Sequence, residues 1–341
     1  LDGAERAVEP QILPGQDLAN DEEREQAMVA EAPVNRVEAP AQPTQEEYER
    51  HQLTHLPYAP WCLHCQRVKS RENKHQRRDE DAERAHNVLH FDYCFFADVV
   101  DVYEDTVDLT QKPHAVLVGY DSDSGSMMGV QVKCKGKGDT YAVGAVRNWI
   151  RSLGITSGVL QADGEESIQA FLREVAKGVE IPLVLRVSAL GDKQSNGAAE
   201  SAVGVLKRQI KVICSQLNVS YEIVLGPRSW LFPWIVRHCG WSVTRFVPRG
   251  PQKRSGYALR HGCAYTGQVL AFGECCIGKE LLADKNKKGA WHTGVFVGKS
   301  ENDCFLVATR QGVIQCRSVR RLEESKQWDK KLLLEVVLLW D

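Results

Sequence analysis

The chain has 341 residues, of which 43% are hydrophobic and 26% are charged, and its formal net charge is −2. This balance is typical of a folded globular protein and excludes a collagen, a coiled coil and a wholly disordered chain. No apolar stretch approaches the roughly 20 residues that span a bilayer, so we expect no membrane span. The N-terminus lacks the pattern of a secretory signal. Because the first residue is Leu, we interpret the chain as a fragment or a segment of a processed polyprotein.

The first 45 residues differ in composition from the rest of the chain. Residues 1–50 hold thirteen acidic and four basic residues, which leaves an excess of seven positive charges in the remainder. Proline recurs through residues 1–45, and large apolar residues are few there. Such a segment cannot bury enough apolar surface to offset its ordering entropy, so we expect a disordered acidic leader. The positive remainder permits a polyanionic partner without demonstrating one.

A possible metal-binding module follows at residues 46–80. His51 and His55 are separated by three residues, and Cys62 and Cys65 by two. Two imidazoles and two thiolates make a ligand set that tetrahedral zinc prefers. The chain has eleven cysteines and no export signal, which indicates reduced thiols, a metal site or both rather than disulfides. We therefore predict a Zn²⁺ site in this segment.

The ligand set of this module has alternatives. Only six residues separate His55 from Cys62, so His64 or His75 can replace one of the two histidines. Unligated surface thiols beside a basic linker are the remaining interpretation. Without metal, a segment this short has little core, and we expect it to be disordered.

From residue 88 onward the apolar pattern predicts an α/β domain over residues 85–250. Alternating or continuous apolar runs predict strands, and apolar residues at helical spacing predict helices. The predicted strands cover 88–97, 115–120, 127–134, 159–162 and 183–187, and the predicted helices cover 143–153, 168–175 and 196–217.

The sequence beyond residue 254 changes to short β segments with glycine between them, which predicts a small all-β barrel over 255–325. Residues 326–341 form a C-terminal extension whose apolar run, 332–340, is either an amphipathic helix or an addition to the fold. We expect the large aromatic residues before the barrel to pack in the core rather than to stack on bases. The predicted barrel strands are 268–272, 294–298, 304–309 and 313–317, and the aromatic residues are Trp230, Phe232, Trp234 and Trp241.

Three acidic residues occupy positions that chemistry can use. Asp92 lies inside an apolar strand, where β-propensity disfavours Asp and an unpaired charge is costly. Asp163 ends a later strand, and Glu200 lies near the start of the long helix. Mg²⁺ takes such carboxylate oxygens, and a pair of ions stabilises the attacking and leaving oxygens in phosphoryl transfer. With 45 acidic residues in the chain, the alternative is that these are solvated surface charges.

The helix that carries Glu200 also carries basic residues. Lys207 and Lys211 recur at seven and four residues from it and share its face. Gly204 lies on the same face, where its missing side chain allows a bulky ligand to approach the backbone. An ordinary solvated helix face is the alternative. A second basic stretch, residues 245–260, can follow a phosphate backbone or be a solvated linker.

These features together resemble a known family. The order Asp92, Asp163, Glu200, with thirty-six residues between the last two, and the run of residues 195–200 that opens the helix resemble the catalytic core of retroviral and retrotransposon integrases. The His/Cys module upstream and the β-rich tail downstream make the resemblance closest to the copia type, over residues 46–325. It implies an α/β fold with an RNase H-like mixed sheet flanked by helices, a small N-terminal zinc-binding module and a C-terminal SH3-like β-barrel.

The resemblance also implies a function. Asp92, Asp163 and Glu200 would hold two Mg²⁺ or Mn²⁺ ions, and the chain would be a polynucleotidyl transferase that joins the 3′ ends of element DNA to target DNA. It would work as a homo-oligomer in the nucleus, after synthesis within a polyprotein. The alternatives are a catalytically inactive, degenerate or domesticated DNA-binding copy and a nuclease of the same fold. The expected DNA contacts are Lys207, Lys211, Arg208 and Asn196, and the expected zinc ligands are His51, His55, Cys62 and Cys65.

Overall fold

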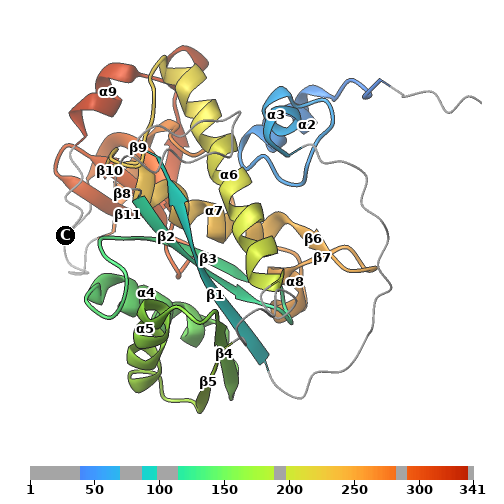
Figure 1. Cartoon of the computed structure of the whole chain (residues 1–341). Helices are drawn as coiled ribbons and strands as arrows, with labels where there is room; N and C mark the ends of the chain where they lie inside the picture. Colours follow the sequence, from blue (N-terminus) through green and yellow to red (C-terminus); the bar gives the residue numbers. More distant parts are fainter. Residues whose placement is uncertain (1–38, 70–86, 98–113, 188–196, 282–289, 337–341) are drawn as a thin grey trace, which may run out of the picture. The chain divides into compact units, whose positions relative to one another are not determined.

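The computed structural model describes residues 39–69, 87–97, 114–187, 197–281 and 290–336. The acidic leader predicted for the N-terminus lies outside these residues up to residue 38, as does most of the basic tail of the predicted zinc module. From Gln42 onward the chain packs as one unit (Figure 1). Among the helices that the structure describes, none combines the length and the apolar character that a membrane crossing requires.

A five-stranded mixed sheet forms the centre of the fold, with the strand order β3-β2-β1-β4-β5. The first three strands pair antiparallel, whereas β1–β4 and β4–β5 are parallel. This is the RNase H-like arrangement that the resemblance implied. The strands are β1 (Asn87–Phe96), β2 (His114–Asp121), β3 (Met127–Val132), β4 (Gly158–Ala162) and β5 (Leu183–Val187).

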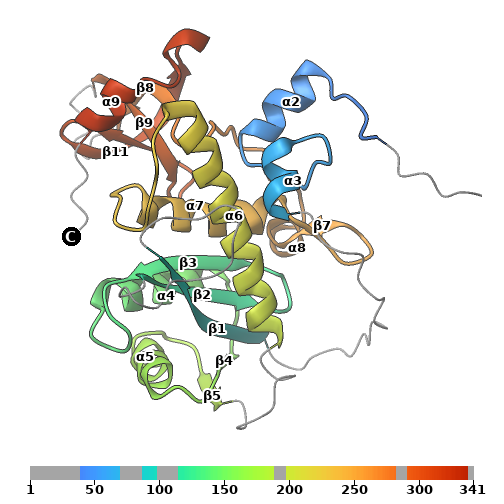
Figure 2. The same ribbon diagram turned by 45° about the horizontal axis from the view of Figure 1, so that its top comes forward.

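Helices cover both faces of this sheet (Figures 1 and 2). On one face, Leu89 and Phe91 of β1 are fully buried against α4 (Thr140–Ser152) and α5 (Glu166–Lys177). Each fully buried side chain of this size contributes about 1.5–3 kcal/mol relative to an exposed one. The α5 stripe predicted from its helical spacing is buried at all four positions, namely Ile168, Phe171, Leu172 and Val175.

The opposite face of the sheet packs against α6 (Gly197–Tyr221) and α7 (Phe232–Phe246). Cys94 and Phe96 of β1 lie in this layer, because successive side chains of a strand point to opposite faces. Helix α7 also covers the free edge of β3, where the Thr244 hydroxyl accepts a hydrogen bond from Met127 N at 2.9 Å. One face of the sheet is therefore covered by α6, and the predicted carboxylate site is considered on that face.

The C-terminal region contains a closed barrel with the strand order β10-β11-β8-β9. One predicted strand is wrong, because residues 268–272 form no strand. Leu270 and Phe272 bury their side chains there from irregular backbone, and Gly273 turns the chain with a φ of 86°. The first barrel strand comes later, at β8. The barrel strands are β8 (Cys275–Glu280), β9 (Trp291–Lys299), β10 (Phe305–Thr309) and β11 (Gly312–Arg321).

Short elements complete the described chain. The C-terminal apolar run forms α9 (Lys330–Glu335) as far as it is described, and Leu333 and Val336 pack into the same core as α6 and the barrel. All eleven cysteines are free, as expected from the sequence. The other elements are β6 (Pro248–Arg249), β7 (Arg254–Ser255), α8 (Gly256–His261) and a 3₁₀ turn at Glu324–Lys326.

Candidate metal centres

Two short helices frame the four predicted zinc ligands. Helix α2 (Gln45–Gln52) starts with a capping box and carries His51 in its last turn. Helix α3 (Leu63–Lys69) carries Cys65, and Cys62 directly precedes it. The helix ends therefore turn an imidazole and two thiols toward one another.

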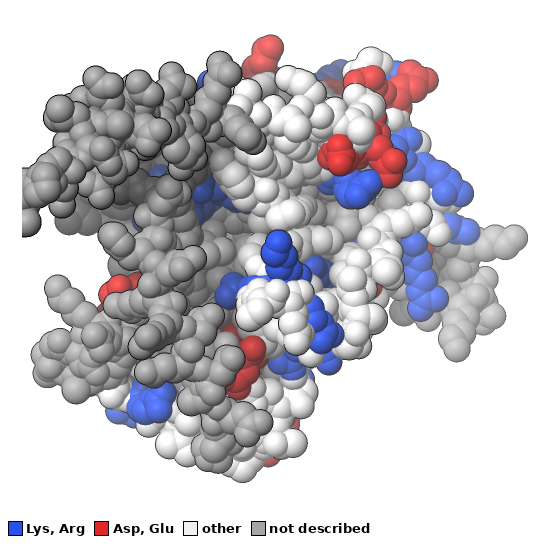
Figure 3. All heavy atoms as spheres, turned by 90° about the vertical axis from the view of Figure 1, so that its right-hand side faces the viewer, with Lys and Arg blue, Asp and Glu red and all other residues white. Residues whose placement is uncertain are grey.

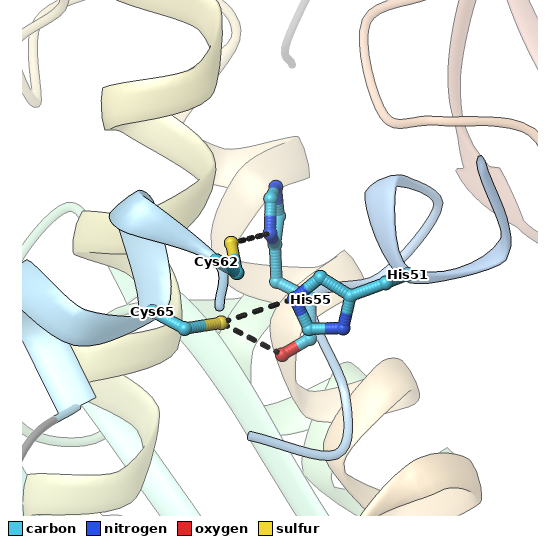
Figure 4. Close-up of side chains that lie close together, drawn as sticks. All are labelled: His51, His55, Cys62 and Cys65. Atoms are coloured by element: carbon cyan, nitrogen blue, oxygen red, sulfur yellow. Dashed lines mark hydrogen bonds between the residues drawn. The ribbon is translucent and has the colours of Figure 1, made fainter. Parts of the chain in front are cut away.

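The structure brings the four side chains together in the interior of this segment (Figure 4). Cys65 Sγ lies 3.3 Å from His51 Nε2, and Cys62 Sγ lies 3.5 Å from His55 Nδ1. The ligand atoms of all four lie within 4.8 Å of one another. With zinc bonds of about 2.3 Å to sulfur and about 2.0 Å to nitrogen, tetrahedral ligand atoms are about 3.3–3.8 Å apart, so a small contraction fits the group to Zn²⁺.

The protonation of this group suits a metal. The thiol of Cys65 shares its proton with Cys62, which lowers the pKa of Cys62 and raises that of Cys65. Burial lowers the pKa of His55 and keeps its imidazole neutral. Burial also lowers the pKa of Lys69 to about 8, against the opposing effect of the nearby thiols. Zinc takes thiolates and neutral imidazoles, so Cys62 and His55 favour the form that binds zinc, whereas Cys65 would release its proton on binding.

Helix α6 supports this segment through buried amide side chains that the sequence analysis missed. Gln216 Oε1 lies 3.2 Å from His55 Nε2, and Gln216 Nε2 donates to Gln52 O at 3.3 Å. Gln209 Nε2 donates to Thr54 O at 2.7 Å. A ligand histidine is usually oriented by a partner on its other ring nitrogen, and Gln216 occupies that position. The signal in the sequence that could have revealed these residues is a pair of glutamines seven positions apart, which lie on one face of a helix.

The structure also bears on the alternative ligands. His64 Nδ1 lies 3.0 Å from the Ser215 hydroxyl, so its ring contacts α6 and is not part of the four-residue group. His75 lies outside the described residues. Of the sets considered from the sequence, the described residues therefore assemble the set that contains His51 and His55.

The register of β1 and β4 bears on the placement of two of the three predicted carboxylates. In the parallel pair β1–β4, His90 is opposite Gln161. Asp92 follows His90 by two residues, and Asp163 follows Gln161 by two, so the same register continued past the end of β4 makes them neighbours. Adjacent strands lie about 4.8 Å apart. By this extension, residues more than seventy positions apart in the sequence come together on two interior strands, near the C-terminal end of β4.

Both aspartates belong to the face that α6 covers. Asp92 is opposite Val118 of β2, which is buried in the layer between the sheet and α6. Cys94, two residues further along β1, lies in the same layer. Ala162 at the end of β4 is buried on the other face, so the next residue, Asp163, falls on the α6 side. Sequence alternation and strand register agree on this placement.

The electrostatics of Asp92 indicate that the other carboxylates are near. Burial raises the pKa of Asp92 to about 6, and the negative charges of Asp163, Glu200 and Glu165 act in the same direction. A hydrogen bond from the Tyr93 backbone N–H to Asp92 Oδ1, at 2.7 Å, opposes the rise. Glu200 is exposed in the first turn of α6. Negative charges of neighbouring carboxylates therefore act on Asp92 near the C-terminal end of β4, where Glu165 is paired with Lys135.

The two centres differ in how far they are assembled. Across the described ranges, one group of three or more His, Cys, Asp or Glu residues has ligand atoms close enough to hold an ion, and it is the His/Cys group. The carboxylates are near enough to repel one another but do not form such a group. A cation would have to draw their oxygens together.

The predicted DNA contacts on α6 occupy different environments. Lys207 Nζ lies 5.8 Å from the centre of the Phe96 ring, at the end of β1. Lys211 is buried, with 7% of its surface exposed, whereas Arg208 is half-buried. Asn196 lies outside the described residues. The role of these residues in DNA binding stays a prediction.

The basic stretch of residues 245–260, which begins in the last turn of α7, is divided between two places. Arg249 Nη1 donates to the Tyr120 hydroxyl at 2.8 Å and lines a pocket of about 230 Å³ beside the first turns of α6. Arg245 and Arg260 line a different pocket, at the edge of β3. Figure 3 shows the side of the molecule where β6 and β7 lie in Figure 1, and Lys and Arg side chains gather over the middle of its described surface. That surface attracts a polyanion.

Comparison with known proteins gives a likeness to solved structures. No protein-family model matches the chain, and no curated protein matches it significantly. An intasome of simian T-cell lymphotropic virus, solved with the PP2A regulatory subunit B56 gamma, is 11% identical, with a TM-score of 0.39 over 77% of this chain and 87% of that one. The HTLV-2 integrase catalytic core domain with magnesium is 12% identical, with a TM-score of 0.35 over 52% and 97%.

A third solved structure in these comparisons is the catalytic core domain of BIV integrase. It is 12% identical, with a TM-score of 0.34 over 51% of this chain and 93% of that one. At these identities the likeness concerns the fold alone. The site is therefore argued from the strand register, burial and charges of this chain.

Proposed function

We propose that the chain is a metal-dependent polynucleotidyl transferase of the integrase type, from a copia-type retrotransposon, that joins element 3′ ends to target DNA in the nucleus. The observation that supports the proposal is the β1–β4 register, which pairs His90 with Gln161 and, continued by two residues, would make Asp92 and Asp163 neighbours under α6. Glu200 enters from the first turn of that helix. Two strand carboxylates and one helix carboxylate on one face are a suitable ligand set for hard divalent cations.

In this function each carboxylate has a role set by its place. Asp92 and Asp163 would hold Mg²⁺ or Mn²⁺ from the rigid sheet, and Glu200 would close the site from the helix. When bound, the ions polarise the phosphate and stabilise the attacking and leaving oxygens. Burial is the main cause of the raised pKa of Asp92, and the negative charges of Asp163 and Glu200 add to it; a divalent cation would offset these charges.

The other regions contribute binding. His51, His55, Cys62 and Cys65 would hold one Zn²⁺ that fixes the N-terminal segment on α6. The basic surface of Figure 3 and Lys207 near the end of β1 would contact the DNA backbone, and two or more copies would hold the two element ends. Binding of this kind weakens steeply as salt increases.

A second function is favoured by one observation. Within the described residues the carboxylates do not form a group that is ready to hold an ion, whereas the His/Cys residues do. A copy that binds DNA through its basic surface and zinc module, without catalysis, would have this property. The two functions differ in whether a divalent cation assembles the carboxylates.

A joining assay with matched variants tests the proposal. Zinc-loaded full-length protein is incubated with Mn²⁺ and labelled duplexes, and joined products are separated by size. We expect Asp163→Asn to reduce joining at least about 1000-fold, because several kcal/mol of transition-state stabilisation are lost. The control is Glu166→Gln, which removes an exposed carboxylate three residues away. Salt-sensitive DNA binding without joining by the unmodified chain would instead establish the second function.

A further inference from the structure

A separate pocket lies at the edge of the sheet formed by β3. Its volume is about 710 Å³, within the range of small-molecule sites. Residues of β3, α4, α7, α8 and β9 line it, and none of the seven proposed metal ligands is among them. The pocket is therefore distinct from both candidate metal centres.

The charged residues of this pocket are predominantly cationic. Arg260 pairs with the buried Asp121 at 3.4 Å, and Lys299 Nζ donates to Asp303 O at 3.0 Å. Arg237 and Arg245, eight residues apart on α7, have no ion pair with any residue in the described part of the chain. Burial lowers the pKa of both guanidinium groups, which nevertheless stay charged because arginine titrates far above neutrality. The charges of Glu301, which also lines the pocket, and of Asp303 act on Arg237 and Arg245 without pairing with them, so the lining keeps an excess of positive charge.

Several buried donors in the lining also lack acceptors. Within the described residues, Trp241 Nε1 and Arg245 Nε are buried and have no hydrogen-bond partner. The Arg245 guanidinium stacks on the Trp241 ring, 4.4 Å from its centre, which fixes its plane. A buried donor without a partner costs about 1–3 kcal/mol, so an acceptor-rich ligand gains by supplying oxygens here.

A buried histidine supports the same conclusion. His238 is 2% exposed, and its Nδ1 has no partner among the described residues, whereas its Nε2 lies 3.2 Å from the Ser242 hydroxyl. Burial, with the charges of Arg237 and Arg245, lowers its pKa to about 3, so the ring is neutral. The pocket thus holds a neutral imidazole beside the two arginines, and its Nδ1 is available to a ligand.

We propose that this pocket binds a phosphate monoester carried by a molecule of about mononucleotide size, at Arg237 and Arg245. Planar guanidinium forks match the oxygens of phosphate, and a dianion offsets two of them. The volume exceeds that of free phosphate, and Trp149, Trp234 and Tyr141 supply apolar walls for the attached body. This site does not depend on the carboxylate chemistry proposed above. The monoester can belong to a free mononucleotide or to the 5′ end of a DNA strand.

Binding to the zinc-loaded full chain tests the site. The probes are deoxyadenosine 5′-monophosphate, deoxyadenosine, and one short single-stranded oligonucleotide with either a 5′-phosphate or a 5′-hydroxyl, titrated by calorimetry. We expect the monophosphate to bind at least about 10-fold more tightly than the nucleoside, because hydrogen bonds to charged groups contribute about 1.5–3 kcal/mol. We expect Arg237→Gln to remove that preference, and the exposed α5 variant Arg173→Gln to retain it.

Comparison of the probes distinguishes the two sources of the phosphate, and the results that would overturn the proposal are equally specific. A preference for the 5′-phosphorylated oligonucleotide over the hydroxyl form assigns the site to strand ends, and a preference confined to the mononucleotide assigns it to the free compound. Equal binding of nucleotide and nucleoside, or equal losses in the Arg237 and Arg173 variants, overturns the proposal. Thermal unfolding checks that Arg237→Gln is folded. If it is not, Arg245→Lys takes its place, since it keeps the charge and removes the planar fork.

Discussion

The zinc segment and the carboxylates of β1, β4 and α6 are both candidate metal centres, yet their ligands are assembled in different ways. Fifteen consecutive residues supply all four His/Cys ligands, whose atoms already lie within 4.8 Å. The three carboxylates come from β1, the end of β4 and α6, and they are positioned by strand register and helix packing. A local site thus depends on its own loop, whereas a distributed site depends on the whole core.

Among the effects predicted here for the two centres, the loss of zinc affinity on removal of one zinc ligand should be the largest. Structural zinc contributes about 10–16 kcal/mol, so Cys65→Ser should remove about 3 kcal/mol and weaken zinc affinity about 100-fold. Competition with a chromophoric chelator measures the affinity. The control is Cys263→Ser, because Cys263 is exposed and outside the group. Equal affinities in the two variants would contradict the assigned ligand set.

A substitution that strains the sheet should affect the region of the carboxylate centre and leave zinc affinity unchanged. A Cβ added at Gly119 of β2 would lie 2.8 Å from Met128 Cγ and 2.9 Å from Phe91 Cε1, on the face of the sheet opposite to that of Asp92. We expect Gly119→Ala to lower the free energy of unfolding by about 1–3 kcal/mol, as overpacked cores do. Denaturant unfolding measures this.

The matched glycine lies in α4. A Cβ at Gly144 meets nothing within 4 Å, so Gly144→Ala should raise stability by about 0.5–1 kcal/mol through helix propensity. Zinc affinity should be unchanged in both glycine variants. A loss of zinc in Gly119→Ala would show that the two centres do not have independent supports.

The side-chain amide of Gln216, which contacts His55 Nε2, tests how this zinc ligand is oriented. Gln216→Leu should weaken zinc about 10-fold, because the partner of the second ring nitrogen is lost. Ser215→Ala removes the contact of His64 instead and should leave zinc affinity unchanged. The opposite result, with the loss in the Ser215 variant, would make His64 the ligand.

A buried histidine outside both centres gives the smallest effect. The pKa of His238 is lowered to about 3 in the folded chain, whereas the unfolded chain takes up a proton near pH 6.5. The unfolded state then binds more protons between these values, so stability falls as pH falls. Between pH 6.5 and 5.5 the loss should be about 1 kcal/mol.

The His238→Gln variant separates this contribution from those of other groups. Denaturant unfolding at the two pH values should give a smaller loss in the variant than in the unmodified chain. Parallel pH dependences in the two proteins would show that the pKa of His238 is the same in the folded and unfolded chain.

Sequence periodicity was sufficient for the elements with long apolar patterns. The α5 stripe and the strands around Asp92 and Asp163 were predicted because burial on a known face leaves a period in the sequence. Residues 268–272 were predicted wrongly because apolar character indicates burial and not ladder hydrogen bonds. Leu270 and Phe272 are buried without them.

Prediction of the candidate sites from the sequence was limited in a similar way, because contacts between distant segments leave no pattern in the sequence. The His/Cys group was predictable because its ligands lie close in sequence. The adjacency of Asp92 and Asp163 depends on strand register, which spacing cannot give, and their ion binding stays a prediction. Gln216 was missed because its partner, His55, is 161 residues away and meets it only after the segment docks on α6.

The continuity of α6 has a mechanical consequence. One uninterrupted helix carries Glu200 in its first turn and Gln216 sixteen residues later, a span of about 24 Å at 1.5 Å per residue. Such a helix acts as a lever, because a tilt of about 5° imposed at one end displaces the other by about 2 Å. That displacement is comparable to a metal–ligand bond length. A chain that has lost zinc would then hold Glu200 less firmly, although no atom of the zinc group touches it.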